Sequence, residues 1–503
     1  MSVSAVGSQS ALAIQQLVSM RAQFDDLQRQ LSTGQKSDTY AGLGLNRGVT
    51  VSLNAQLSAI TGYDDSINNV TARISLMNTA LTRMSAIGNT VKAAIVQGNT
   101  TGNGSGTSLA QQTAQSSLDE MLGLLNTQAG DRYLFSGRAT DQPAVATLDH
   151  ILNGNGTQAG LKQLISERKQ ADLGADGLGR LAINQPTATS VSVSEDAAPP
   201  FGLKLVSVNS NLTNGSVTGP TGTPATLSID LSGGVPNAGD TVDLRFNLPD
   251  GSSTNLTLTA STKQPPGPNE FAIGATPAAT AANLQAALTT AVGKLAGGAL
   301  TAASAVAASN DFFNADSNNP PQRVAGPPFD TATAMTAGSA ANSVIWYTGE
   351  AGSGSARATA TARIDPSLAV SYGARANEDG IRTLVQNIAT LAAVTVSPTD
   401  PNAADLSNAL NQRLTANLSG SAGTQSITNI ESDLANAQGS MSAATSRHQQ
   451  TSATLNDFLQ QIQGVSNEEV GAQILTLQTR MQASMQTTAM LFQTSLINYL
   501  PHA

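Results

Sequence analysis

Apolar residues near the start of the chain recur at alternating intervals of three and four residues. The first run spans residues 17–31, and a second begins at residue 53 and continues to residue 95. Such spacing puts the apolar side chains on one face of a helix and is typical of helices that pair. Between the runs, the glycines of STGQKSDTYAGLGLNRG (32–48) make helix continuation costly. The pattern predicts a helix, a break, and a long second helix over about 46–97.

The end of the chain carries the same pattern. Leu455, Phe458, Ile462 and Val465 form one apolar seam, and Val470 opens another that runs to residue 500. Between the two seams, Ser466 and Glu469 have the spacing of a capping box, which restarts a helix. We therefore predict a second pair of long helices with one break between them.

Two long seams at opposite ends of one chain most simply pair with each other, although two independent bundles are the alternative. The expected fold class is mainly α. Its principal element is a long antiparallel coiled-coil rod formed by the N- and C-terminal helices, and a small α+β domain is inserted in the middle of the chain. A helix over 46–97 is itself about 75 Å long at 1.5 Å per residue.

The faces of these helices away from the seam carry Gln, Ser, Thr, Ala and Asn rather than the Lys and Glu that usually solvate an isolated coiled coil. A weakly charged exterior, together with an apolar stripe that reaches residue 500, predicts lateral packing against other copies of the chain. Each covered Leu or Met would contribute about 1.5–3 kcal/mol. The expected assembly interface comprises Leu17, Met20, Phe24, Leu27, Leu31, Val470, Ile474, Leu477, Met481, Met485, Leu491, Leu496 and Leu500.

Three further helices are predicted closer to the middle of the chain. Residues 108–129 and 378–393 each place apolar residues on one face, and Asn377 is a plausible N-cap of the second helix. An alanine-rich polar helix is expected across 402–450. The chain would thus run out along the rod, make an excursion and return.

The excursion, over about 190–350, differs in composition, because it contains most of the 20 prolines. TVDLRFNLPDGSSTNLTLTAS (241–261) alternates apolar and polar residues on both sides of Pro-Asp-Gly, which predicts a hairpin with one buried face. ATLSIDLSG (225–233) suggests a third strand. Thr276-Pro277 then opens a helix with Leu284, Leu288, Val292 and Leu295 on its inner face, proline being suited to the first helical position.

Composition argues against several functional classes. A net charge of −9 opposes nucleic-acid binding, which rests on Lys and Arg neutralising phosphates. The chain has no cysteine, and its three histidines, His150, His448 and His502, lie on different predicted elements, so a zinc site is improbable. The glycines of GADGLG (174–179) match neither a dinucleotide fingerprint nor a P-loop. We expect no catalytic residue, no metal and no cofactor.

Membrane insertion and the general secretory route are also not expected. The first cationic residue is Arg21, and glutamines interrupt the early apolar stretch SALAIQQLV, whereas a signal peptide needs a basic region followed by an unbroken apolar one. No apolar run of the roughly 18 residues needed to span a bilayer is present.

Four segments resemble bacterial flagellins and their relatives. LQRQLSTGQKSDTYAGLGL (27–45), with the heptad after it, and VGAQILTLQTRMQASMQTTAMLFQTSLINYL (470–500) are similar to the N- and C-terminal regions of flagellins. DRYLFSGRATDQPAV (131–145) looks like a motif shared with the hook-filament junction protein, hook-associated protein 3. VSYGARANEDGIRTLVQNIATLA (370–392) looks like both groups. The resemblance covers roughly residues 1–140 and 370–500.

This resemblance implies an extracellular location in the bacterial flagellum, where the end helices line a tubular filament and the insert decorates its surface. The implied partners are other copies of the chain, hook-associated proteins, a flagellar export chaperone and the type III export apparatus. The expected domains are a helical N-terminal rod (1–140), a loop-rich connection (141–189), an inserted surface-exposed α+β domain (190–350) and a helical C-terminal rod (351–503).

Two other functions stay open at this point. The chain could be the junction protein between hook and filament, although a large insert suits the bulk filament surface better. It could instead be a secreted coiled-coil adhesin that binds through the insert, but such a protein would need a signal peptide or a membrane barrel, and the sequence shows neither.

Overall fold

The structure is a computed structural model that describes residues 3–97, 108–197, 200–397, 399–420 and 423–497. The chain forms two compact units. The terminal unit comprises Met1–Asn69, Arg363–Ala369 and Gly439–Ala503, and the central unit comprises Val70–Ala362 and Val370–Gln438. Two long helices, α2 (Arg47–Val96) and α10 (Ile427–Gln463), contribute residues to both units.

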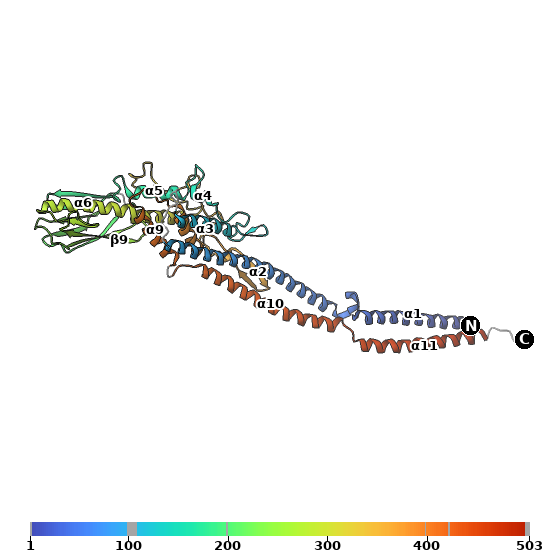
Figure 1. The fold of residues 1–503 in the computed structure, drawn as a ribbon. Coiled ribbons are helices and arrows are strands. Elements are labelled where there is room, and N and C mark those ends of the chain that lie inside the picture. The colour runs from blue at the N-terminus through green and yellow to red at the C-terminus, as the bar shows by residue number, and fades with distance from the viewer. Residues whose placement is uncertain (1–2, 98–107, 198–199, 398, 421–422, 498–503) are drawn as a thin grey trace. The chain divides into compact units, whose positions relative to one another are not determined.

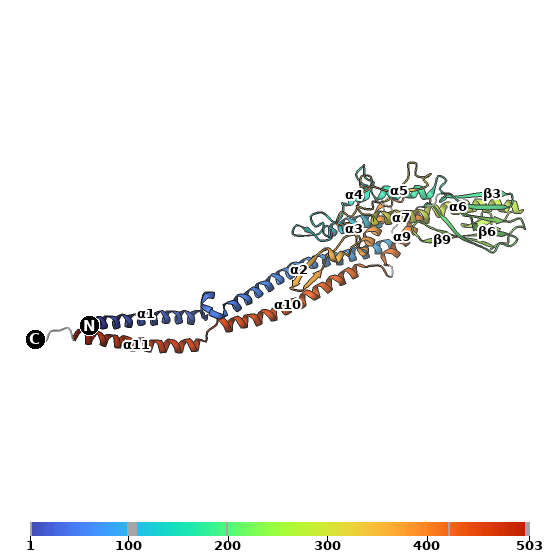
Figure 2. The ribbon, with the colours of Figure 1, turned by 180° about the vertical axis from the view of Figure 1, so that it is seen from behind.

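In the terminal unit, α1 (Val3–Thr33) and α11 (Asn467–Ile497) run side by side, as Figures 1 and 2 show from opposite directions. The predicted breaks are present. A short 3-10 segment, η1 (Tyr40–Asn46), separates α1 from α2, and Gly464 to Ser466 separate α10 from α11. The Oγ of Ser466 accepts a hydrogen bond from the backbone N–H of Glu469 (3.3 Å), so Ser466 caps α11.

The predicted long helix over 46–97 is confirmed as α2, within one residue at each end. Most of its seam is buried, and the buried members share the spacing read from the sequence: Leu53, Ile67, Val70, Ile74, Met77, Leu81, Met84, Val91 and Ile95. Long helices at both ends and a strand-rich middle are thus confirmed, while regular coiled-coil packing stays a prediction.

Two predictions about the C-terminal helices are wrong. Residues 402–450 form two helices, α9 (Ala403–Leu418) and the start of α10, because the chain leaves the helix at Gly420 and Gly423, whose φ angles are 78° and 87°. Phe458 does not lie in the seam. It is 49% exposed, and its neighbour Leu459 is buried with Leu53 and Leu455 instead.

The helices predicted over 108–129 and 378–393 appear as α3 (Leu109–Leu125) and α8 (Asp379–Ala393). The Ser108 hydroxyl caps α3 by accepting from the Gln111 N–H. The Asn377 cap is wrong, because Glu378 occupies the N-cap position and no side chain caps α8. The carboxylate of Glu378 instead accepts hydrogen bonds from the guanidinium of Arg357 and from the backbone N–H of Arg375.

Further elements lie after α3 that the sequence patterns did not reveal. Strands β1 (Gln128–Ala129) and β2 (Arg132–Tyr133) pair across a tight turn, and helices α4 (Leu148–Asn153) and α5 (Leu161–Leu173) follow within the segment expected to be loop-rich. α4 and α5 are short, and α5 has six buried residues of mixed type, so neither shows a clear apolar period.

The insert and residues 181–187, which precede it, form two four-stranded sheets. The first has the antiparallel order β3-β4-β7-β6, with bounds β3 (Leu181–Thr187), β4 (Ser190–Glu195), β7 (Thr226–Asp230) and β6 (Ser216–Thr221). The second has the order β10-β9-β8-β5, with bounds β10 (Glu270–Ala272), β9 (Ser253–Ser261), β8 (Thr241–Asn247) and β5 (Lys204–Ser210). The predicted hairpin is β8–β9, and the predicted third strand is β7, which belongs to the other sheet.

One apolar helix completes the core of the insert. α6 (Pro277–Leu295) begins at Thr276, whose hydroxyl accepts from the Ala279 N–H, and continues through the π turn η2 (Ala296–Leu300) into α7 (Thr301–Asn314). By length and composition Pro277–Asn314 could cross a membrane, but 67% of its apolar window is buried inside the protein. Leu284, Leu288 and Val292 pack into the same core as the two sheets, as predicted, so this is a core helix.

The remaining short elements lie between α7 and α8. Their bounds are β11 (Arg323–Val324), β12 (Met335–Thr336), η3 (Ala356–Thr359), β13 (Thr361–Asp365) and β14 (Leu368–Ser371).

Candidate assembly surface

The contact between α1 and α11 uses one face of each helix. Val470 and Leu477 of α11 are buried, and the seam positions of α1 between residues 17 and 27 are half-buried. Among the residues predicted for assembly, Leu17, Met20, Phe24, Leu27, Ile474 and Met481 are half-buried, and Leu31 and Met485 are exposed. The side chains of Leu491 and Leu496, and the whole of Leu500, lie outside the described residues. Even where it is paired, this seam leaves apolar area uncovered.

A second apolar face lies on each of these helices, away from the seam. On α1 it contains Ile14 and Val18, which are one helical turn apart, and Val18 is 63% exposed. On α11 it contains Leu475 and Met490, which are 66% and 63% exposed. We call these the outer faces. The seam predicted from the heptads omits all four residues, although each stands among uncharged neighbours.

The outer faces are part of a wider asymmetry in exposed apolar area. Most of the exposed large apolar side chains among the described residues belong to the terminal unit. Exposed apolar side chains that gather on one part of a protein often mark a surface that binds something. The α1–α11 pair also carries little charge, with Arg480 the sole Asp, Glu, Lys or Arg in α11 after Glu469. Both features favour contact with further apolar helices over permanent exposure to water.

The two helix breaks are joined to each other. Gln35 and Gly464 form an antiparallel bridge in which Lys36 N–H donates to the Gln463 carbonyl (2.7 Å) and Val465 N–H donates to the Gly34 carbonyl (3.1 Å). These bonds satisfy backbone groups that each interrupted helix leaves free. The segment that follows α1 is thereby joined to the segment between α10 and α11.

Within the terminal unit, α2 and α10 also pack through a seam. Leu53 of α2 contacts Leu455 and Leu459 of α10 in one apolar cluster. Further along, the Nδ1 of His448 lies 2.6 Å from the Oδ1 of Asp64, and His448 is only 5% exposed. Asp64 keeps the 4,3 spacing between Ile60 and Ile67, so its place in the seam is legible in the sequence, whereas its partner is not.

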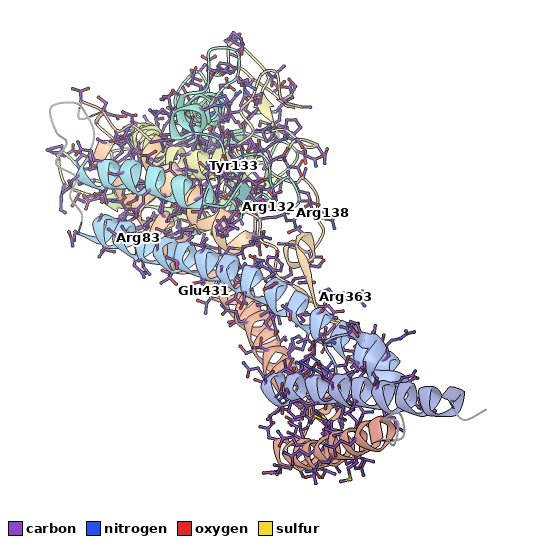
Figure 3. All side chains as sticks on the ribbon, turned by 90° about the vertical axis from the view of Figure 1, so that its right-hand side faces the viewer. Arg83, Arg132, Tyr133, Arg138, Arg363 and Glu431 are labelled. Carbon is purple, nitrogen blue, oxygen red and sulfur yellow. The ribbon has the colours of Figure 1, made fainter. Side chains whose placement is uncertain are left out.

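In the central unit, the DRYLFSGRATDQPAV segment lies between two other segments of the chain. Ser136 bridges Arg375 and Val145 bridges Tyr347, while Phe135 is fully buried. Figure 3 shows Arg132, Tyr133 and Arg138 of this segment. Arg132 and Arg138 are exposed on it. The segment that resembles the junction protein is therefore an integral part of the central fold.

Charged groups also join the helices of the central unit. Arg83 of α2 donates to both carboxylate oxygens of Glu120 on α3 (2.5 and 2.9 Å), and this contact lowers the pKa of Glu120. Thr82 of α2 donates to Glu431 of α10 (3.1 Å), and Figure 3 shows Arg83 and Glu431 on these helices. Both contacts are exposed, so each contributes little to stability.

The insert is attached to the returning helices by a buried ion pair. Nε of Arg413 on α9 donates to Oδ2 of Asp250 (2.8 Å), in the turn of the β8–β9 hairpin, and the side chains are 16% and 5% exposed. Ser252 N–H and Oγ donate to the other oxygen of Asp250. No sequence pattern joined these residues, which are 163 positions apart.

No group of three or more His, Asp or Glu side chains within the described ranges is arranged to hold a metal ion. His150 contacts Gln158 and His448 contacts Asp64, whereas His502 lies outside those ranges. The notable surface of the molecule is apolar and helical.

Long terminal helices with uncovered apolar faces, joined to a globular insert, define a helical structural subunit. Comparison with known families agrees. Residues 7–140 match the family model of the bacterial flagellin N-terminal helical region, and this match supports a relationship of the chain to the flagellin superfamily. No curated protein matches the chain. Flagellins are structural rather than enzymatic proteins that polymerise with themselves into the extracellular filament of the bacterial flagellum, so the match supports a filament structural subunit in general.

Proposed function

We propose that this chain is the subunit of the flagellar filament and that it polymerises through the seam and the outer faces of α1 and α11. The observation that carries the proposal is the exposed apolar area of the terminal unit, in particular Val18 and Leu475. Burying such side chains against neighbouring copies stabilises each contact by about 1.5–3 kcal/mol when coverage is complete. The residues predicted from the heptads belong to the same interface.

The proposed organisation follows the domains expected from the sequence. Residues 1–140 and 351–503 supply the helical polymer, 141–189 connect them to the insert, and 190–350 face the medium. The insert has its own core, formed by the two sheets and α6, and this supports an independent surface role. Proposed partners during export and assembly are a flagellar chaperone, the type III export apparatus and hook-associated proteins.

The alternative is the junction protein between hook and filament. The observation that favours it is the resemblance of the DRYLFSGRATDQPAV segment to the junction protein. This segment is built into the central fold through the bridges of Ser136 and Val145. A junction protein would add a limited ring at the hook end, whereas a filament subunit would add to its own polymer without limit.

Negative-stain electron microscopy distinguishes these functions. Purified full-length chain is concentrated and seeded either with fragments of filament or with isolated hooks. Long tubes of uniform diameter are expected on filament seeds. Attachment to hook ends without elongation would favour the junction protein, and monomers that neither elongate nor attach would refute both functions.

Matched variants test the surface. Leu475→Asp places a carboxylate on the outer face of α11 and is expected to abolish elongation. Val206→Asp places one on an exposed apolar position of β5, in the insert, and is expected to leave elongation intact. Loss of elongation in both variants would indicate that the insert, too, is part of the polymer contact.

A further inference from the structure

The seam between α2 and α10 contains one polar pair where its pattern calls for apolar residues. On α2, Asp64 follows Ile60 by four positions and precedes Ile67 by three. On α10, His448 stands seven positions from both Met441 and Leu455, which are buried. The two polar residues are therefore opposite each other at equivalent positions of the seam.

The surroundings of His448 leave its imidazole ring dependent on Asp64 for a polar contact. The Nδ1 of His448 contacts Asp64 at 2.6 Å, and the ring of Tyr63 lies 6.0 Å from the imidazole ring, centroid to centroid. Within the described residues the Nε2 of His448 is buried and has no hydrogen-bond partner. Asp64 is thus the only polar contact that the structure gives the imidazole ring, and losing it would leave a buried polar group without any.

We propose that the Asp64–His448 pair fixes the register in which α2 and α10 pack. A heptad seam of Leu, Ile, Met and Ala repeats every seven residues, so apolar packing by itself discriminates poorly between registers one heptad apart. A slip by one heptad would place Asp64 opposite Met441 or Leu455. The imidazole of His448 would then be buried without a partner, which is costly, and Asp64, whose side chain is 35% exposed, would lose its hydrogen bond.

The same logic predicts that the pair contributes specificity rather than stability. Well-packed apolar residues often replace a buried ionic or polar pair without loss of stability, and a single polar residue in a seam is an established means of setting register. The proposal concerns packing within one copy of the chain. It therefore stands or falls independently of the proposed polymerisation.

The natural absence of cysteine allows a direct measurement of register. Ala55→Cys on α2 and Ala443→Cys on α10 are exposed positions in the terminal unit that can carry spin labels. Double electron–electron resonance then reports the distance between the labels in the full-length chain. Labelled chain is diluted into an excess of unlabelled chain, so that distances between copies do not contribute. A slip by one heptad moves one helix by about 10 Å along the other.

Three backgrounds are compared, and circular dichroism reports whether each variant is folded. The natural pair is expected to give one narrow distance. Asp64→Leu with His448→Leu is expected to keep its helicity and unfolding midpoint but to gain a second distance. Asp64→His with His448→Asp restores a polar pair with the residues exchanged and is expected to return the single distance.

The outcomes decide the proposal. A single unchanged distance in the double-leucine variant would overturn it, because apolar packing would then suffice to set the register. A second distance in the exchanged variant would also overturn it, since a complementary polar pair would not be what fixes the register. If the double-leucine variant does not fold, the exchanged variant still provides this test.

Discussion

Leu475 provides the sharpest test of the outer face, because it lies on the same helix as Leu477 but away from the seam. Leu475 is 66% exposed and Leu477 is 7% exposed. If another copy covers Leu475 in the polymer, assembly buries about two-thirds of a leucine side chain there. At about 1.5–3 kcal/mol for a complete side chain, Leu475→Ala would remove roughly 1–2 kcal/mol from each assembly step.

That free energy appears as a change in the critical concentration for polymerisation. Since about 1.4 kcal/mol corresponds to a tenfold change in an equilibrium constant, we expect the critical concentration of Leu475→Ala to rise roughly 5- to 30-fold. It is measured by seeded elongation and sedimentation over a range of concentrations. The unfolding midpoint of the unassembled chain should not change, because the side chain contacts water in a single copy.

Leu477→Ala is the matched comparison and should behave differently. It removes a buried side chain from the α1–α11 contact, at a cost of about 2–5 kcal/mol. Loss of helical signal from the single copy is therefore expected in addition to poorer assembly. Wild-type critical concentration in Leu475→Ala would refute the idea that another copy covers the outer face of α11.

Three further predictions concern stability within the central and terminal units. Asp250→Ala leaves Arg413 buried without its carboxylate and should lower the free energy of unfolding by about 3–5 kcal/mol in denaturant titrations. Gly62→Ala, at a helical position with open space around its Cβ, should raise the free energy of unfolding by about 1 kcal/mol, whereas Gly88→Ala should not, because its Cβ would meet a leucine at 2.7 Å; thermal unfolding of both variants checks this. Burial raises the pKa of Asp311, so the folded state holds the carboxyl proton of Asp311 more tightly than the unfolded state does. The resulting contribution to the free energy of unfolding is present at low pH and is lost as the pH rises through the pKa that Asp311 has in the folded state. Asp311→Asn should remove that part of the pH dependence, and an unchanged profile between pH 3 and 7 would contradict the assignment.

Local patterns predicted much of the helical framework, because a helix has a fixed period that the spacing of apolar residues reveals directly. They located α2 within one residue at each end, and the start of α11 at Ser466. The β8–β9 hairpin was equally legible, since strand alternation and a Pro-Asp-Gly turn are local features. The same approach missed α4 and α5, which are short and lack a clear apolar period.

The candidate surface was only partly accessible from the sequence. Heptads identified the inner seam of α1 and α11 but not the outer faces, because a residue such as Leu475 is recognised as uncovered only after its partner helix is in place. Phe458 shows the same limit. Spacing allows either Phe458 or Leu459 to enter the seam, and the orientation of α10 against Leu53 decides for Leu459.

The sequence by itself determined the length and phase of α2, the breaks after α1 and before α11, and the presence of a strand-rich insert. These features depend on backbone geometry and on residues close together along the chain. Tertiary structure alone decided which polar groups meet, as Asp64 meets His448 across 384 positions and Asp250 meets Arg413 across 163. Local spacing can place a polar residue such as Asp64 in a seam, but it does not show which residue it meets, because the contact arises only when distant segments pack and a buried polar group requires a partner.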